Sequence, residues 1–260
     1  MSDIIDDLAA EHAALDALVA DLTEEQWRTA TPAEGWDVLD SVSHIYFYDE
    51  RALVAMTDPP AFAKHVEDVI ANGLAVGHDT DPGRGLGGAG LLAAWREARS
   101  RLIDAMRAYP EGERALWYGP AMSLKSFVTA RLMETWAHGV DVSDALGRPV
   151  VVSDRLRSVC HISIGARAYS FYARGVDDPG DPIWLELTGP SGDVWTWGPE
   201  DATNRVNGPA LDLALLVTQR RNIADTALVV EGETAALWLS IAQSFAGPSG
   251  GGRAPLSATV

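Results

Sequence analysis

The chain has 260 residues, of which 47% are hydrophobic and 22% are charged, an ordinary balance for a globular protein of one large or two modest domains. Its formal net charge of −17 argues against a nucleic-acid partner and against an anionic membrane surface, because both require a basic face. The only cysteine, Cys160, excludes an intramolecular disulfide.

The N-terminal segment and the hydropathy of the chain predict a cytoplasmic protein. Residues 1–7 contain neither a basic segment nor an apolar run, so they do not have the form of a signal peptide. No apolar run approaches the roughly 18 residues that a membrane span needs. We therefore expect a soluble protein, either a monomer or a homodimer, with no membrane partner.

Residues 1–148 are predicted to form an all-α domain, because apolar residues recur there at helical spacing. Thr23–Gln26 has the form of a capping box, and Asp37 is a good N-cap for the helix that follows it. The glycine-rich stretch 83–90 is predicted to be a loop, as are the nearby His78, Asp79 and Asp81. The predicted helices are 5–22, 37–56, a third that begins near residue 60, 91–109 and 123–146. Four principal helices indicate a bundle, whose cofactor sites are built from inward-facing side chains.

The character of the sequence changes after Pro149, and residues 149–247 are predicted to form an α+β domain. Two short aromatic runs on either side of a glycine-proline turn have the pattern of a β-hairpin. The predicted elements are the helices 154–174, 209–219 and 233–245 and the strands 183–187, 194–197, 204–206 and 226–230. Residues 248–260 are predicted to be a flexible tail.

The spacing of Glu134 and His138 is the main indication of function. Positions i and i+4 lie on one face of a helix, where a carboxylate and an imidazole can bind the same metal ion. Asp141 follows three residues after His138 and is a candidate catalytic residue that orients this imidazole. His44, in a second apolar helix, is the best candidate for a third ligand. Three protein ligands would leave one position of a tetrahedral metal open for catalysis.

The same spacing also fits an ordinary surface ion pair. Burial favours the metal, because the 123–146 helix is apolar around most of its circumference and would hold both side chains inside the bundle. From these patterns alone, a metal site and a plain ion pair both remain open. Arg131, one turn before Glu134, is a candidate cofactor-binding residue, with a simple pairing to that carboxylate as the alternative.

Three segments, in order along the chain, carry a family resemblance. Gly35–Ile45 is similar to the pattern GW-x-V…H-L, and Met133–Asp141 is similar to E-x-x-x-H-G-x-D. Leu216–Arg221 is similar to T-G-R-R, with Gln219 in place of the glycine. These motifs resemble the mycothiol-dependent maleylpyruvate isomerase family of the DinB-like superfamily. More narrowly, Met133–Asp141 and Gln243–Pro248 resemble an actinobacterial subgroup described as metal-binding proteins.

The resemblance implies a DinB-like four-helix N-terminal domain that holds a divalent metal, most often Zn²⁺, and an α+β C-terminal domain similar to sterol-carrier folds. It implies His44, Glu134 and His138 as the metal ligands, and mycothiol or a similar thiol at the open metal position. It also makes Arg220 and Arg221 candidate catalytic residues that clamp an anionic substrate. The same arginine pair would equally suit the C-terminal end of a helix.

These expectations describe an enzyme that acts on a small unsaturated substrate, and the arginine pair favours a substrate that carries a carboxylate. A thiol bound to zinc loses its proton at neutral pH, and the thiolate adds to an activated alkene. If rotation and elimination follow, the enzyme is a cis–trans isomerase; if the reaction stops after addition, it is an S-transferase. The alternatives are a non-catalytic, metal-containing carrier of small molecules and a metal-dependent hydrolase.

Overall fold

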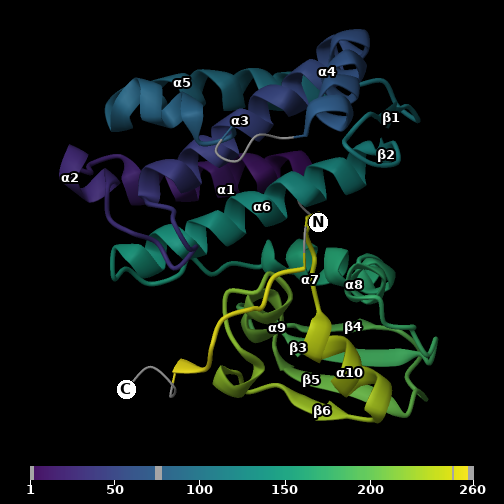
Figure 1. Ribbon diagram of the computed structural model, residues 1–260. Coiled ribbons are helices and arrows are strands. Elements are labelled where there is room, and N and C mark those ends of the chain that lie inside the picture. The colour runs from purple at the N-terminus through teal and green to yellow at the C-terminus, as the bar shows by residue number, and fades with distance from the viewer. Residues whose placement is uncertain (1–2, 74–77, 248, 257–260) are drawn as a thin grey trace. The chain divides into compact units, whose positions relative to one another are not determined.

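The computed structural model describes residues 3–73, 78–247 and 249–256, and it divides into two compact units (Figure 1). The helical unit is Met1–Val151, and the α+β unit, which combines helices with a sheet, is Val152–Val260. The fold class expected from the sequence, a helical N-terminal domain followed by an α+β domain, is confirmed.

Four long helices form the body of the helical unit: α1 (Ile4–Val19), α3 (Val38–Thr57), α5 (Asp81–Ala108) and α6 (Leu124–Ala145). Helix α3 packs against α5 and α6, and α1 packs against the same two helices. Their apolar faces enclose a core in which Leu39, Trp95 and Leu102 are fully buried. The unit also contains the short helices α2 (Glu24–Trp27) and α4 (Pro59–Asn72) and the small hairpin of β1 (Arg114–Ala115) and β2 (Met122–Ser123).

Side-chain caps explain where several of these helices begin. Thr23 forms the predicted capping box at α2, since its hydroxyl accepts from the backbone N–H of Gln26 at 3.2 Å. Asp37 and Asp40 form a second capping box at α3, and Ser123 caps α6. Each cap satisfies a backbone N–H that has no partner within its own helix. The caps therefore fix the starts of α3 and α6, the two helices that carry the candidate metal ligands.

The prediction of a loop over the glycine-rich stretch 83–90 is wrong, because α5 runs through it with a single non-helical residue, Gly87, at φ +70°. The reason is tertiary packing. A Cβ added to Gly83 would lie 2.6 Å from the Cβ of Ser43, and one added to Gly88 would lie 2.2 Å from the ring of Trp27. The lack of side chains therefore lets α5 approach α2 and α3 closely. This close approach outweighs the low helix propensity of glycine.

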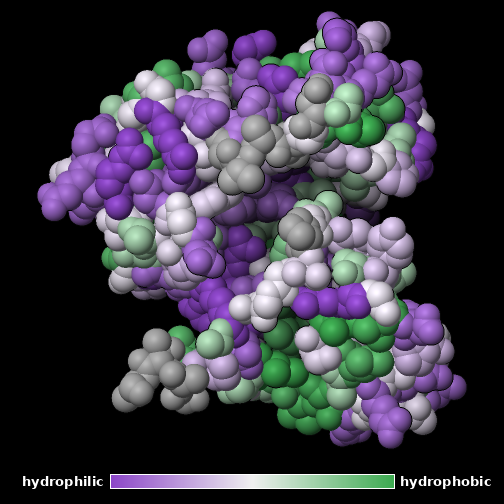
Figure 2. All heavy atoms as spheres, in the orientation of Figure 1, coloured by the Kyte–Doolittle hydropathy of each residue, from purple (hydrophilic) through white to green (hydrophobic). Residues whose placement is uncertain are grey.

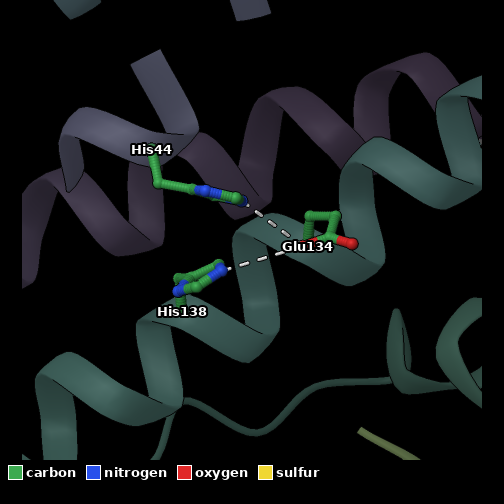
Figure 3. A group of neighbouring side chains, drawn as sticks. All are labelled: His44, Glu134 and His138. Atoms are coloured by element: carbon green, nitrogen blue, oxygen red, sulfur yellow. Dashed lines mark ion pairs between the residues drawn. The ribbon is translucent and has the colours of Figure 1, made fainter. Parts of the chain in front are cut away.

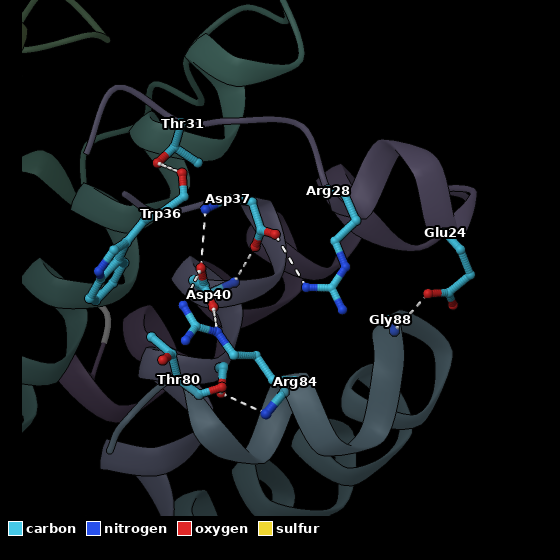
Figure 4. A network of polar contacts seen from close by, with 11 residues as sticks. Glu24, Arg28, Thr31, Trp36, Asp37, Asp40, Thr80, Arg84 and Gly88 are labelled. Atoms are coloured by element: carbon cyan, nitrogen blue, oxygen red, sulfur yellow. Dashed lines mark hydrogen bonds and ion pairs between the residues drawn. The ribbon is translucent and has the colours of Figure 1, made fainter. Parts of the chain in front are cut away.

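A polar network holds the beginning of α5 against α2 and α3 (Figure 4). Arg84 donates to the two carboxylate oxygens of Asp40 at 2.8 and 3.1 Å. Glu24 accepts from the backbone N–H of Gly88 at 3.2 Å. Because Asp40 also belongs to the capping box of α3, the network joins the starts of α3 and α5.

The α+β unit contains a four-stranded sheet in the order β4-β3-β5-β6. The strands are β3 (Ile183–Thr188), β4 (Val194–Trp197), β5 (Asn204–Pro209) and β6 (Val229–Glu231). The β3–β4 hairpin is antiparallel, as predicted, whereas β3 and β5 are parallel and β5 and β6 are antiparallel. The helices are α7 (Leu156–Gly165), α8 (Arg167–Arg174), α9 (Ala210–Val217) and α10 (Glu233–Ile241), with a 3-10 helix at Ile223–Asp225.

The prediction of one helix over 154–174 is wrong, because two helices, α7 and α8, meet at Ala166. After the break, Ser170 and Phe171 are buried within the α+β unit. The hydroxyl of Ser170 donates to the carbonyl of Gln243 at 3.1 Å. Apolar spacing did not reveal the break, because the chain is helical on both sides of it and the packing of α8 depends on residues far along the sequence.

Part of the segment predicted to be a flexible tail lies against the α+β unit. The side chain of Asn222 donates to the carbonyl of Arg253 at 2.9 Å, and the backbone N–H of Leu256 donates to Asp225 at 3.1 Å. Residues 248 and 257–260 lie outside the described part of the chain. The flexibility of this segment stays a prediction.

The surface of the two units differs in the view of Figure 2. Hydrophilic residues predominate over the helical unit, and a contiguous hydrophobic area lies over α10 of the α+β unit. Among the described residues, no helix has both the length and the apolar character needed to cross a bilayer.

Candidate metal centre

The structure brings His44, Glu134 and His138 together in the helical unit (Figure 3). His44 lies on α3, and the other two residues lie one turn apart on α6. Oε2 of Glu134 is 3.8 Å from Nε2 of His44 and 3.7 Å from Nε2 of His138. One ligand atom from each residue lies within 4.8 Å of the other two. We refer to these three residues as the triad.

Each imidazole of the triad has a second carboxylate on its other nitrogen. Nδ1 of His44 is 2.6 Å from Oδ2 of Asp79, and Nδ1 of His138 is 3.4 Å from Oδ2 of Asp141. A carboxylate beside Nδ1 favours the tautomer that carries its proton there, which leaves a lone pair on Nε2. Both Nε2 atoms and the Glu134 carboxylate then face one another as electron-pair donors. A cation between them removes this repulsion.

The charges around the triad keep its carboxylate ionised. Burial alone raises the pKa of Glu134, but His44, His138 and Arg131 outweigh burial and hold this pKa at about 2. Burial lowers the pKa of His44, but Asp79 and Glu134 outweigh it and raise this pKa above its usual value. The surplus of negative charge therefore favours a positive species at the imidazoles, which can be a proton or a metal ion.

The donor set of the triad fits a divalent metal. Imidazole nitrogen and carboxylate oxygen bind Zn²⁺ at about 2.0–2.2 Å, so tetrahedral ligand atoms are separated by roughly 3.3–3.6 Å. The observed separations of 3.7 and 3.8 Å are close to that spacing. Three protein ligands leave a fourth position for an external group.

The contact between Asp79 and His44 corrects the expectation that Asp79 lies in a solvated loop. The two residues are 35 positions apart, and no helical or strand period relates them. They meet because the chain just before α5 packs against α3, where the hydroxyl of Ser43 also accepts from the backbone N–H of Gly83 at 2.8 Å. The sequence offered no local signal for this contact.

Asp79→Asn is expected to weaken zinc binding by roughly 10–100-fold, because an amide cannot hold the His44 ring as a charged acceptor does. Competition titration with a chromogenic chelator measures this affinity. The control is Asp81→Asn, which removes an exposed carboxylate two residues away and is expected to leave the affinity unchanged. If Asp79→Asn binds zinc as tightly as the wild type, Asp79 does not orient His44.

Aromatic side chains surround the triad. The Trp36 ring is stacked on the His138 ring, with centroids 5.7 Å apart, and its centroid is 5.3 Å from that of His44. The Tyr48 ring lies 4.7 Å from His44. These contacts restrict the orientation of both imidazoles. Neither Trp36 nor Tyr48 was predicted as a site residue, although both lie in or beside the Gly35–Ile45 motif.

Arg131 lies in a buried polar network beside the triad. Its Nη2 is 3.0 Å from Oδ1 of Asp49 on α3. Asp49 also accepts from Nε1 of Trp95 at 2.9 Å and lies 3.2 Å from Nε2 of His12. All four side chains are buried. The contacts give Arg131 a part in holding α6 against α3, and its cofactor-binding role stays a prediction.

Arg220 and Arg221 follow α9 in the α+β unit. The backbone N–H groups of Arg220 and Gln219 donate to the carbonyls of Leu215 and Leu216 at 2.7 and 2.9 Å, which is the Schellman pattern of a helix end. Gln219 has φ +61°, a left-handed conformation in which glycine is usual. Both guanidinium groups donate to nearby backbone carbonyls. Their role as a substrate clamp stays a prediction.

The fold and the site define a protein with a candidate metal centre in a helical bundle and a separate α+β unit. A family model described as the mycothiol maleylpyruvate isomerase N-terminal domain matches residues 8–143, which is more than half of the chain and includes the triad. The chain therefore belongs to the mycothiol maleylpyruvate isomerase family. A second model, described as wyosine base formation, matches residues 179–231.

Curated relatives and solved structures are similar over most of the chain. An uncharacterized protein of Mycobacterium tuberculosis, present in two strains, is 46% identical over 250 residues, which is 95% of this chain and 96% of the relative. The crystal structure of the mycothiol-dependent maleylpyruvate isomerase matches with a TM-score of 0.56 at 16% identity, over 89% of this chain and 92% of that chain. A histidine-to-alanine mutant of that isomerase matches with a TM-score of 0.54 at 16% identity, over 86% and 91%. The solved structures share the fold.

Proposed function

We propose that the protein is a metal- and thiol-dependent enzyme that isomerises a small unsaturated carboxylic acid, or transfers the thiol to it. The observation that carries the proposal is the convergence of His44, Glu134 and His138 in a member of this family. Mycothiol is the thiol we propose, because the solved structures with this fold are described as a mycothiol-dependent isomerase. Zinc is the metal we propose, because imidazoles and a carboxylate are among its usual ligands.

The residues around the triad favour the binding of a metal ion and of an external thiol. A bound divalent cation would lower the pKa of a thiol in its open position, so that the nucleophilic thiolate is present at neutral pH. Glu134 is ionised, and Asp79 and Asp141 favour imidazole tautomers with a free lone pair on Nε2. Cys160 is a poor nucleophile, because it is buried and burial raises its pKa to about 12. The reactive sulfur is therefore expected to come from a separate thiol.

Mycothiol is expected to raise the melting temperature of the zinc-loaded protein more than that of the zinc-free protein. A ligand that binds only the folded state stabilises it by about 2.7 kcal/mol at a 100-fold excess over its Kd. Differential scanning calorimetry of the full chain measures both shifts. The control is an analogue of mycothiol with a hydroxyl in place of the thiol, which is expected to shift both forms equally. If mycothiol itself shifts both forms equally, the thiol does not bind the metal.

The reaction can be identified with unsaturated acids, beginning with maleylpyruvate, in the presence and absence of mycothiol. An isomerase converts the cis acid to the trans acid and leaves the thiol unconsumed, whereas an S-transferase consumes the thiol and forms an adduct. Zinc-dependent hydrolysis without any thiol would contradict the proposal and would favour a hydrolase.

A further inference from the structure

Arg51 on α3 forms no ion pair with an acidic side chain among the described residues. Ion pairs with aspartate are formed by Arg28, Arg84, Arg96, Arg99, Arg107, Arg131 and Arg167. The Nε of Arg51 is buried and has no hydrogen-bond partner in the described part of the protein. A partly buried guanidinium with unused donors is suited to bind an external anion.

Arg51 lies on the face of α3 that carries the triad. Tyr48 and Arg51 follow His44 at positions i+4 and i+7, which places all three on one side of the helix. Side chains on a helix lean toward its N-terminus, so both residues lean toward His44. The contacts agree with this direction. The Tyr48 ring lies 4.7 Å from the His44 ring, and Cζ of Arg51 lies 5.5 Å from the ring centroid of Phe47, one turn back.

Tyr48 adds a neutral hydrogen-bond donor between Arg51 and the metal ligands. The Tyr48 ring lies 4.7 Å from the His44 ring, and its phenol hydroxyl can donate a hydrogen bond to an anion.

Aromatic rings lie next to both side chains, with Phe47 beside Arg51 and Tyr118 beside Tyr48. Burial lowers the pKa of His65, and the positive charge of Arg51 acts in the same direction. Nε2 of His65 and the hydroxyl of Tyr118 are 2.8 Å apart, and the Tyr118 ring lies 5.9 Å from the Tyr48 ring. Arg51, Tyr48 and the rings beside them therefore combine a cation, a hydroxyl and flat apolar faces, a combination that suits a planar carboxylate.

We propose that Arg51 and Tyr48 bind a carboxylate of the substrate, so that the helical unit itself holds the acid beside the triad. The proposal rests on the proposed function for the reaction that follows, but not for the binding. Arg51 would bind the carboxylate through the paired N–H groups of its guanidinium, and Tyr48 would donate to an oxygen on the side of the triad. The ligand class is a short, flat, unsaturated acid, and its recognition does not require Arg220 or Arg221.

Titration calorimetry of the zinc-loaded full chain with maleate, a planar cis-dicarboxylate, tests this site. Arg51→Gln is expected to weaken maleate binding by about tenfold or more, because the charged, bidentate contact is lost. Arg51→Lys keeps the positive charge but lacks the paired N–H groups of a guanidinium, so its affinity for maleate is expected to lie between those of the wild type and Arg51→Gln. The matched control is Arg107→Gln, which removes one positive charge from an exposed ion pair between α5 and Asp6 of α1 and is expected to bind maleate as the wild type does.

The outcomes separate this site from the proposed function. Equal maleate affinity in the wild type and Arg51→Gln, or no binding to the wild type at millimolar maleate, would overturn the carboxylate site. Zinc content and the mycothiol shift are measured on the same samples. If both fail while maleate binding still depends on Arg51, the proposed function is wrong and the carboxylate site stands. If Arg51→Gln does not fold, Arg51→Lys carries the test, and wild-type affinity in it would overturn the proposal.

Discussion

Replacement of His138 by alanine is expected to abolish stoichiometric zinc binding. The substitution removes one of three ligand atoms that lie within 4.8 Å of one another, and it leaves only one residue on each of two helices. The loss of affinity should exceed the roughly 10–100-fold effect of removing an outer partner of a ligand. Elemental mass spectrometry of the purified protein measures the metal content.

Two further variants make the zinc experiment specific. His161→Ala removes the same imidazole from α7 of the α+β unit, and it is expected to retain zinc. Glu134→Gln preserves the size of the side chain but removes the negative charge that attracts the cation, so it is expected to lose zinc as well. Undiminished zinc in His138→Ala would contradict the assignment of the ligands.

Asp49→Asn is expected to destabilise the helical unit by about 3–5 kcal/mol, the usual effect of removing one partner of a buried ion pair. Asp49 is fully buried, and its carboxylate contacts Arg131 at 3.0 Å and His12 at 3.2 Å. Asparagine cannot neutralise the guanidinium, which would remain charged inside the protein. Urea denaturation followed by the helical circular dichroism signal measures the free energy of unfolding.

The control for Asp49→Asn is Asp6→Asn, which breaks an exposed pair with Arg107. The two side chains of that pair are 61% and 54% exposed, so less than about 1 kcal/mol is expected to be lost. Combining Asp49→Asn with Arg131→Met is expected to recover part of the stability, because no charge then remains unpaired. A loss below about 1 kcal/mol in Asp49→Asn would mean that another group compensates the buried guanidinium.

The contribution of Asp49 to stability also depends on pH in a defined direction. Burial raises the pKa of Asp49, but His12 and Arg131 outweigh it and lower this pKa from 3.8 to about 2. A carboxyl group with a lowered pKa in the folded state stabilises the protein above its unfolded-state pKa. This stabilisation is lost as the pH falls from about 3.8 to about 2. The difference in unfolding free energy between the wild type and Asp49→Asn should therefore shrink over that range.

The buried network matters for the site because of where its members lie. Asp49 follows Tyr48 directly on α3, and Arg131 precedes Glu134 by one turn on α6. The contact between Asp49 and Arg131 therefore joins the two helices next to the triad. Arg131, which the sequence suggested for cofactor binding, therefore has contacts that help to position the candidate metal ligands.

Local spacing was enough to predict the part of the candidate centre that lies on α6. Glu134 and His138 share a face because of the helix period alone, and Asp141 lies beside His138 for the same reason. The capping boxes that begin with Thr23 and Asp37 involve residues only three positions apart. In each case the interacting groups are neighbours within one turn, so the pattern of the sequence already contains the contact.

Contacts between distant segments could not be read in this way. Asp79 meets His44 only because the chain before α5 packs against α3. The start of α5 is helical despite its glycines because it packs closely against Ser43 and Trp27, which leave no room for side chains at Gly83 and Gly88. The parallel pairing of β3 and β5 and the break between α7 and α8 likewise depend on packing within the α+β unit. The sequence alone therefore specified the helix periods, the caps and the chemistry of the candidate ligands. The surroundings of the site were set by the packing of segments that lie tens of residues apart. No local pattern encodes the energy of that packing.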